Sequence, residues 1–384
     1  MKKKLSNKLA ISFLIAVFIA SFGLSGCRKK APAPAKKTYN GIVMNYYKVF
    51  DDKEVIKPAI EKFEVDHPGI KINYRQFSDF QEYQNVILNE MAEGEGPDIF
   101  SMPNTWFMSN YKKIYPAPAT LATPELFQKV FADVAYKDLV RTDQDGLEQV
   151  YALPMTVDTL ALYYNKAHFE DSISERGSPS STWEGIKEDI SLLKKEDNSF
   201  ERFAVAGLAM GRADNIDRGV DILYLLFLQY GAKFYNENIS ETTFASKVGD
   251  AYPGMEALEF FTSFADPDQK YYTWNEFMVD DDSASREVEA FAKGKVSMII
   301  GYSYAYNQIV DEIKAWKDKG IDVIDKNDIG ITYIPQLYDP EVSTKKRVTY
   351  ASYFAETVSR NTQYPDLAWS FLTDYLIQKD NLDG

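Results

Sequence analysis

The residues that carry most nucleophilic and metal chemistry in proteins are scarce in this sequence. Its 384 residues include one cysteine, Cys27, and two histidines, His67 and His168. A single cysteine excludes an internal disulfide and leaves no thiol pair for a metal site. The sequence also contains neither a P-loop nor a dinucleotide-binding glycine pattern. We therefore expect no metal and no cofactor.

Positive charge is also in deficit. Lys and Arg together number 43, against 57 Asp and Glu, which gives a formal net charge of −14. Nucleic acid binding needs clustered basic residues, so this balance argues against nucleic acid as a partner. Hydrophobic residues make up 45% and charged residues 26%, as in folded globular proteins. The length predicts two domains.

The first 26 residues differ from the rest. Four lysines precede an almost wholly apolar stretch, residues 9–26, which predicts an export signal. The alternative is a retained membrane anchor, since 18 apolar residues could just span a bilayer. The segment Leu24-Ser25-Gly26-Cys27 resembles the lipobox of bacterial lipoproteins, which implies cleavage before Cys27 and lipid attachment to it. Residues 27–37 are basic and rich in Pro and Ala, and we interpret them as a tether.

From Thr38 onward, strand-like and helix-like patterns alternate. The predicted strands include "GIVMNYY", "IKINYRQF", "PDIFSM" and residues 159–165, and helical spacing of apolar residues predicts helices over 56–65 and 80–91. Further helices are expected around 181–193, 219–230, 254–265 and 284–293, and one beginning near Pro365. Asp145-Gly146 predicts a hairpin turn rather than a calcium loop. This alternation is typical of an α/β fold with mostly parallel sheets flanked by helices.

Four segments, in this order, resemble the family 1 extracellular solute-binding proteins, which include the maltose-binding and other sugar-binding proteins of ABC importers. They are "EGEGPDIFSMPNTWF", "VYALPMTVDTLALYYNKAHFED" with the following "STWEGI", "AFAKGKVSMIIGYSYAYNQ" and "YASYFAETVSRNTQYPDLAWSFLTDYL". The resemblance implies the two-lobed, periplasmic-binding-protein-like fold of type II, with a ligand cleft between the lobes.

The resemblance also implies how the chain is divided. The first lobe is expected to take residues 38–155 and 295–348, and the second lobe residues 156–294 and 349–384. Family members usually continue for several dozen residues beyond this point. We therefore expect the last segment to be incomplete or the second lobe to be reduced.

Candidate ligand-binding residues end or follow predicted strands, lie in an aromatic loop, or lie at the expected crossing between lobes. They are Tyr46, Tyr47, Asn104, Trp106, Thr156, Asp158, Trp274, Tyr302, Ser303 and Tyr304. Aromatic rings suit sugars, because the C–H faces of a sugar lie on rings while its hydroxyls take polar partners. Each of these residues could instead have a packing role, and Asp158 could simply cap local backbone groups.

Ser303 raises the question of catalysis. Gly301-Tyr302-Ser303-Tyr304-Ala305 falls one residue short of a nucleophile elbow, and in such hydrolases the histidine follows the serine in the chain. Both histidines precede Ser303, so we expect no catalytic residue and no enzyme activity. A glycoside hydrolase, which needs a pair of carboxylates at a defined distance, is kept as an enzyme alternative. For Asp280-Asp281-Asp282, a charged loop is favoured over a cation site.

Taken together, the sequence predicts an exported lipoprotein, held on the outer face of the cell membrane by its lipid. We expect a monomer that binds a carbohydrate in the cleft and delivers it to the membrane permease of an ABC importer by hinge closure. A peptide or another polar solute is the alternative ligand. A surface glycan-binding lipoprotein without a transporter is a further alternative.

Overall fold

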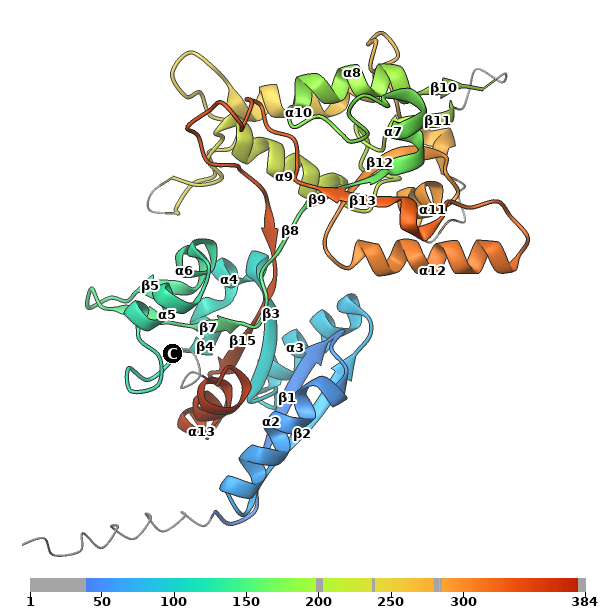
Figure 1. The fold of residues 1–384 in the computed structure, drawn as a ribbon. Coiled ribbons are helices and arrows are strands. Elements are labelled where there is room, and N and C mark those ends of the chain that lie inside the picture. The colour runs from blue at the N-terminus through green and yellow to red at the C-terminus, as the bar shows by residue number, and fades with distance from the viewer. Residues whose placement is uncertain (1–38, 198–202, 237–238, 280–282, 284, 379–384) are drawn as a thin grey trace, which may run out of the picture.

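The chain folds into two lobes, each with its own hydrophobic core. The structure is a computed structural model that describes residues 39–197, 203–236, 239–279, 283 and 285–378. One core draws its buried residues from 44–153 and 353–372, and the other from 160–334. Figure 1 shows the two lobes apart from one another, with extended segments running between them.

The first lobe is built on a six-stranded sheet in the order β2-β1-β3-β15-β4, with β7 also paired to β15. Its strands are β1 (Ile42–Val49), β2 (Ile70–Phe77), β3 (Ile99–Pro103), β4 (Ile114–Tyr115), β7 (Ala152–Pro154) and β15 (Phe354–Ser359), and a hairpin of β5 (Val140–Thr142) and β6 (Glu148–Val150) lies beside it. In that hairpin Gly146 takes the left-handed backbone, φ +81°, and Asp143 accepts from the N–H groups of Asp145 and Leu147. The predicted turn is confirmed.

Helices cover the first sheet. They are α2 (Lys53–Asp66), α3 (Phe80–Glu93), α4 (Asn104–Asn110), α5 (Pro124–Val130), α6 (Asp133–Leu139) and α13 (Pro365–Ser370), which continues as the π-helical turn η4 (Phe371–Leu376), and a short 3₁₀ turn η1 (Tyr111–Lys113) follows α4. The α2 and α3 helices begin at aspartates, Asp52 and Asp79, whose side chains accept free N–H groups of the first turn. The helices predicted over 56–65 and 80–91 are thus confirmed.

The second lobe is built on a five-stranded sheet in the order β10-β11-β12-β9-β13. Its strands are β9 (Ala161–Asn165), β10 (Lys195–Glu196), β11 (Phe203–Leu208), β12 (Val296–Gly301) and β13 (Ile329–Thr332). Its helices are α7 (Lys166–Ser172), α8 (Trp183–Leu193), α9 (Gly219–Tyr230), α10 (Pro253–Ser263), α11 (Arg286–Ala292) and α12 (Ala305–Asp318), with 3₁₀ turns η2 (Glu276–Met278) and η3 (Lys326–Asp328). The cap of α8 is Thr182, one residue after the expected Ser181.

Two short strands join the lobes. β8 (Asp158–Thr159) pairs antiparallel with β14 (Ala351–Ser352), so that Asp158 lies opposite Ser352 and Thr159 opposite Ala351. β8 leaves the first lobe after β7, and β14 returns to it before β15 (Figure 1). We call residues 155–159 and 350–354 the lobe junction.

The expected division of the chain between lobes is wrong in its second half. β12 and β13, within residues 295–348, belong to the second sheet, where β12 pairs with β11 and β9. β15, within residues 349–384, belongs to the first sheet, where it pairs with β3, β4 and β7. A wholly buried strand carries the same apolar pattern in either sheet, so its composition does not indicate which lobe it joins.

The sheets are also mixed, whereas mostly parallel sheets were expected. Parallel pairing is limited to β1–β2, β1–β3 and β11–β12 among the described strands, and the other pairs are antiparallel. The cause is the junction. β9 and β15 each start at the junction and run away from it, while their neighbours β12 and β3 run toward it.

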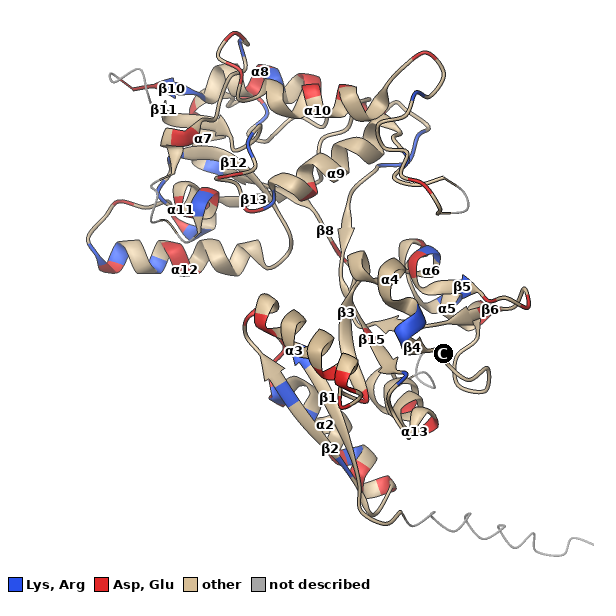
Figure 2. Ribbon diagram, turned by 180° about the vertical axis from the view of Figure 1, so that it is seen from behind, with Lys and Arg blue, Asp and Glu red and all other residues tan. Residues whose placement is uncertain are grey.

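The charged residues are spread over both lobes. Figure 2 marks Lys and Arg as well as Asp and Glu at positions on the helices and loops of both lobes. Within the described ranges, no helix is both long enough and apolar enough to cross a membrane.

A buried ion pair holds the centre of the first lobe together. Lys48 of β1 is 2% exposed, and its ammonium bonds the carboxylate of Glu356 of β15, which is fully buried. The same carboxylate accepts hydrogen bonds from Tyr46 Oη at 2.8 Å and Ser101 Oγ at 3.0 Å. Lys48 also reaches the more exposed Asp51, at 2.9 Å. Both buried charges are therefore paired and hydrogen-bonded.

Removing only one partner of this pair should strongly destabilise the fold. Lys48→Met leaves Glu356 buried without its counter-ion, and we expect the free energy of unfolding to fall by about 3–5 kcal/mol. Adding Glu356→Gln should recover most of that loss, because the amide oxygen still accepts from Tyr46 and Ser101. Chemical denaturation of both variants measures the difference. Lys57→Met, which breaks an exposed ion pair with Glu54, is the control and should leave the free energy of unfolding unchanged. Equal stability of Lys48→Met and the parent would contradict a structural role for the buried pair.

Candidate functional site

The first strand extends two residues beyond the predicted one, and this moves two candidate residues into the core. Tyr46 is fully buried, with ring contacts to Tyr74 and Phe371 and its hydroxyl on Glu356. Tyr47, on the opposite face, is 8% exposed and lies under the guanidinium of Arg75. Both rings were expected to end the strand and contact a ligand, whereas the structure places them within β1 and in the core of the first lobe.

Phe50 is the residue that follows β1, and its ring is 58% exposed. It lies in the left-handed region at φ +69°, where a bulky residue is strained. Several contacts hold it there: Phe50 N–H donates to Phe77 O at 2.8 Å, and Asp51 is held by Lys48 and by Tyr74 Oη. Strain that the surroundings maintain is characteristic of functional positions.

Four aromatic rings meet at the edge of the first lobe next to the junction. Phe50 packs edge-on against Phe354 at 6.2 Å between ring centroids, Phe354 against Phe80 at 6.0 Å, and Phe80 against Trp106 at 5.2 Å. Phe354 is itself the last residue of the lobe junction. We call these four rings the aromatic wall. Trp106, a predicted site residue, is one of its members and is partly exposed.

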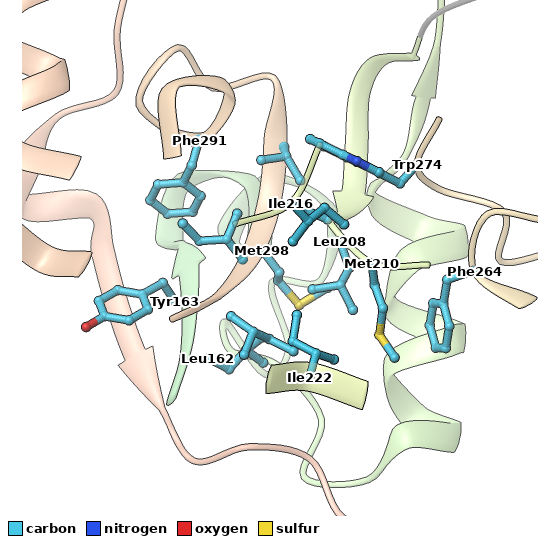
Figure 3. Close-up of a cluster of buried hydrophobic side chains, with 14 of the residues drawn as sticks. Leu162, Tyr163, Leu208, Met210, Ile216, Ile222, Phe264, Trp274, Phe291 and Met298 are labelled. Carbon is cyan, nitrogen blue, oxygen red and sulfur yellow. The ribbon is translucent and has the colours of Figure 1, made fainter. Parts of the chain in front are cut away.

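The second candidate tryptophan has a different place. Trp274 is fully buried in the core of the second lobe, and its Nε1 donates to Asn215 Oδ1 at 2.9 Å. Figure 3 shows it among the buried side chains, with Leu208 and Ile216 near it. No surface of the ring is open to a ligand, so the expectation that Trp274 faces the cleft is wrong.

The turn after β12 brings four predicted site residues together. Ser303 donates its hydroxyl to Asp158 Oδ2 at 2.7 Å, and its backbone N–H lies 3.2 Å from the same oxygen. The ring of Tyr302 lies 5.8 Å from that of Tyr304, which is 44% exposed. Asp158 belongs to β8, so these contacts tie the turn in the second lobe directly to the junction.

The hydroxyl of Tyr302 is buried and has no hydrogen-bond partner within the described chain. Burial raises the pKa of Tyr302, and the nearby Asp221 carboxylate raises it further. Ser352 of the junction and Tyr350 also lie close to this hydroxyl. Buried polar atoms in native proteins nearly always have a partner, so the hydroxyl points to a bound group or water.

The first-lobe side of the junction has a similar polar group. Asn104 begins α4 and donates its amide to Ala351 O at 3.3 Å, while its buried Oδ1 has no partner among the described residues. Tyr353 Oη donates to Asp138 Oδ2 at 2.7 Å. Burial raises the pKa of Asp138. Thr156, another predicted site residue, lies exposed between the lobes in the junction.

The hydrogen-bond partner of the Ser303 hydroxyl is the Asp158 carboxylate, and this bond holds the turn after β12 against β8. Of the two histidines, His168 Nδ1 contacts Ser297 Oγ at 2.9 Å and His67 stacks on Phe63. No group of three or more potential metal ligands occurs among the residues that the structure describes. Asp280, Asp281 and Asp282 lie outside those residues.

Sequence reasoning missed Phe50, Phe80, Phe354, Tyr350, Asp138 and Asp221. Phe50 could have been found from the strand–turn boundary, had Lys48 been recognised as a buried strand residue. The others lie on helices, on β15 or, for Tyr350, just before β14, and only the three-dimensional arrangement brings them to the junction. Burial raises the pKa of Asp221. The nearby Arg218 guanidinium lowers that pKa and so offsets the rise only in part.

A buried carboxylate supports the start of α9, the helix that carries Asp221. Glu287 is 2% exposed, and its Oε2 accepts the backbone N–H of Asp217 at 2.9 Å. Arg286, next to it, forms an ion pair with Asp217 at 3.4 Å. Burial raises the pKa of Glu287 to about 7.

Two α/β lobes, joined by a pair of crossing strands with polar and aromatic groups at the crossing, define a two-lobed binding protein of the periplasmic type. Residues 50–381 match the sequence model of the bacterial extracellular solute-binding proteins. This chain belongs to that family.

Solved structures share the fold. An ABC substrate-binding protein from Listeria monocytogenes, in complex with cycloalternan, has a TM-score of 0.59 at 17% identity, over 88% of this chain and 75% of that one. The GacH receptor of Streptomyces glaucescens, solved unliganded and with acarbose, has a TM-score of 0.59 at 18% identity, over 90% and 78%.

Two sequence relatives are informative. A protein of Brucella abortus named as a binding protein is 23% identical over 337 residues, which is 85% of this chain and 68% of the relative. The galactooligosaccharide-binding protein of Bacillus subtilis is 28% identical over 179 residues, which is 46% of this chain and 38% of that protein.

Glu287 should make stability depend on pH. Its folded pKa of about 7 exceeds the ordinary 4.5, so between these values the folded chain holds a proton that the unfolded chain has released. The free energy of unfolding should therefore fall as pH rises through this window, by about 3 kcal/mol from this group. Glu287→Gln should remove that decline, as denaturation at pH 5 and pH 8 would show. Glu259→Gln, on the exposed side of α10, is the control and should keep the decline in stability. A decline that persists in Glu287→Gln would show that Glu287 is not its source.

Proposed function

We propose that this chain is the solute-capturing subunit of an ABC-type importer and that its solute is a mono- or oligosaccharide. The family match over residues 50–381 carries the proposal. Sugar as the solute is supported by the neighbours solved with cycloalternan and acarbose and by the relative named for galactooligosaccharides. The chemistry of the junction supports it independently.

The two lobes offer complementary groups to a sugar. The aromatic wall of the first lobe presents ring faces and edges on which the C–H face of a sugar can lie. The turn after β12 and the junction present a hydroxyl and a carboxylate, those of the exposed Tyr304 and of Asp158, to which sugar hydroxyls can bond. A solute between the lobes would touch both sets of groups.

Capture would proceed by closure about the junction. A solute that contacts both lobes gains contacts in the closed state that the open state lacks, and this difference shifts the hinge equilibrium toward closure. The closed form would be the one that the membrane permease recognises. We propose that the subunit is monomeric and that it makes or breaks no covalent bond in the solute.

We further propose that the chain is exported and attached to the membrane by a lipid on Cys27. The apolar stretch before Leu24-Ser25-Gly26-Cys27 supports this, as does the extracellular character of the family. Residues 27–37 would then serve as a tether between the membrane and the folded lobes. These residues lie outside the described part of the chain.

Truncating one ring of the aromatic wall should weaken sugar binding without unfolding the protein. For Phe50→Ala and for Trp106→Ala we expect a loss of roughly 1–3 kcal/mol in binding free energy, because each removes a stacking surface at a binding hot spot. A thermal-shift screen of mono- and oligosaccharides, with peptides as the alternative solute, identifies the ligand, and calorimetry on the variants then measures the loss.

The controls separate binding from folding. Trp316→Ala removes a surface tryptophan of α12 that lies between Lys293 and Lys319, and it should leave the affinity unchanged. Trp274→Ala should instead lower stability by about 3–5 kcal/mol, since it empties a core position. Parent-like affinity in both Phe50→Ala and Trp106→Ala would show that the site is placed wrongly, and a solute found only among the peptides would replace sugar as the ligand.

Replacing Cys27 tests the anchor. In Cys27→Ser the lipid has no thiol to attach to, so the processed protein should move from the membrane fraction to the soluble fraction and lose metabolic lipid label. Cell fractionation with mass determination of the N-terminus measures both. Membrane retention of a Cys27→Ser protein whose first 26 residues have been removed would refute lipid anchoring.

A further inference from the structure

Carboxylates from three different elements surround the lobe junction. Asp138 comes from α6 in the first lobe, Asp158 from β8 in the junction and Asp221 from α9 in the second lobe. Burial raises the pKa of Tyr350, and the carboxylates of Asp221 and Asp138 are both near enough to raise it further. The three acids therefore belong to one region, although α6 and α9 are far apart in the sequence.

Positive charge near these acids is limited. Arg218 Nη1 lies 3.6 Å from Asp221 Oδ2, too far for a good hydrogen bond. On the first-lobe side, Arg141 and Lys137 act on Asp138, but its pKa stays above the ordinary value because burial outweighs them. Arg218 also has Asp217 near it, which is already paired with Arg286. The carboxylates at the junction are thus only partly compensated.

Two buried acceptor atoms with no partner lie in the same region. The hydroxyl of Tyr302, a residue that is 2% exposed, has no hydrogen-bond partner among the described residues, and the Asp221 carboxylate is near enough to raise the pKa of this hydroxyl beyond the effect of burial. The Oδ1 atom of Asn104 is likewise buried and unpaired, close to Asp138. An amide oxygen can only accept hydrogen bonds, so it requires a donor from outside the described chain.

We propose that the solute carries a protonated amine and that this ammonium group binds at the junction among Asp138, Asp221, Tyr302 and Asn104. The inference rests on the proposed sugar-binding function and deepens it, because it makes the solute an amino sugar or an oligosaccharide of amino sugars. The aromatic wall then contacts the ring of the sugar, while the acids hold its amine.

The inventory of donors and acceptors favours an amine over a neutral hydroxyl. The junction offers carboxylate oxygens, an amide oxygen and a phenol oxygen, all of which accept hydrogen bonds. An ammonium group has three donors and no acceptor, whereas each sugar hydroxyl has one donor and brings an oxygen that needs donors in return. Hydrogen bonds between charged groups are also about twice as strong as neutral ones. An ammonium would therefore satisfy the unpaired atoms and compensate the acids together.

Matched disaccharides test the preference. The β1→4-linked disaccharide of glucosamine, its N,N′-diacetyl derivative and cellobiose share a backbone and differ at one position on each sugar ring, where only the first carries a charged group. Calorimetry at a pH where the amine is protonated should give at least about tenfold tighter binding of the amine than of the other two. Raising the pH above the pKa of the sugar amine should abolish the difference.

Variants assign the effect to the junction. Asp221→Asn and Asp138→Asn should each reduce the ratio between amine and neutral affinities, while cellobiose binding changes less. Asp268→Asn, at an exposed aspartate in the loop after α10, should leave the ratio unchanged. Thermal denaturation of each variant confirms that it is folded before its affinity is compared.

The outcomes separate this inference from the function on which it rests. Equal or tighter binding of the neutral sugars overturns the preference for an amine and leaves sugar binding standing. Binding of neither kind of sugar, while a peptide or another solute binds, overturns the proposed function and this inference with it. An amine preference that survives in both aspartate variants overturns the placement of the ammonium group at the junction.

Discussion

The pairing of β8 with β14 is the constraint on which the arrangement of the two lobes depends. These two-residue strands carry the chain between the lobes, and side-chain hydrogen bonds tie the pair to each lobe. On the first-lobe side, Tyr353 is bonded to Asp138 and Asn104 to Ala351; on the second-lobe side, Ser303 is bonded to Asp158. Rotation of the lobes must therefore take place in the few backbone bonds between these ties. Short hinges of this kind convert small changes in backbone angles into large movements of a lobe.

The two sides of the junction differ in chemistry, and the difference has a structural origin. The aromatic wall stands where β1 ends and β15 begins, above the buried pair of Lys48 and Glu356, which joins these same two strands. Because Lys48 also holds Asp51, the pair keeps Phe50 in its strained conformation. The polar side arises from the turn after β12, where Gly301 lets the chain pass close to Ala305 and Tyr163. The exposed aromatic rings therefore stand on the first-lobe side, whereas buried atoms without a partner among the described residues lie on both sides, at Asn104 and Tyr302.

Local features were predictable from the sequence because they depend on local physics. Apolar spacing located α2, α3 and α9, and Asp-Gly located the hairpin turn. Two kinds of feature were not predictable. A lysine that looks like the end of a strand can be buried if a distant acid pairs with it, and Glu356 lies 308 residues from Lys48. Similarly, nothing local separates Trp106, at a lobe edge, from Trp274, in a core, since both follow aromatic-rich or strand-like segments. For the candidate site, the sequence could place the turn at 302–304 and Asp158 in one site. It could not add Asp138 on α6 or Asp221 on α9.

The order of the strands in the first sheet bears on how the protein is made. β15, which pairs with β3, β4 and β7, begins at Phe354, after the whole second lobe has been synthesised. The second lobe is continuous in sequence, from about residue 160 to 350, and can acquire its core as soon as it is complete. The first lobe cannot close its sheet until the end of the chain arrives, and pairings between such distant segments form slowly. The unpaired edge of β3 and the uncompensated Lys48 would remain exposed until then. A chain of this design has a built-in delay before its first lobe is folded, because the core of that lobe needs strands from both sides of the second lobe in the sequence.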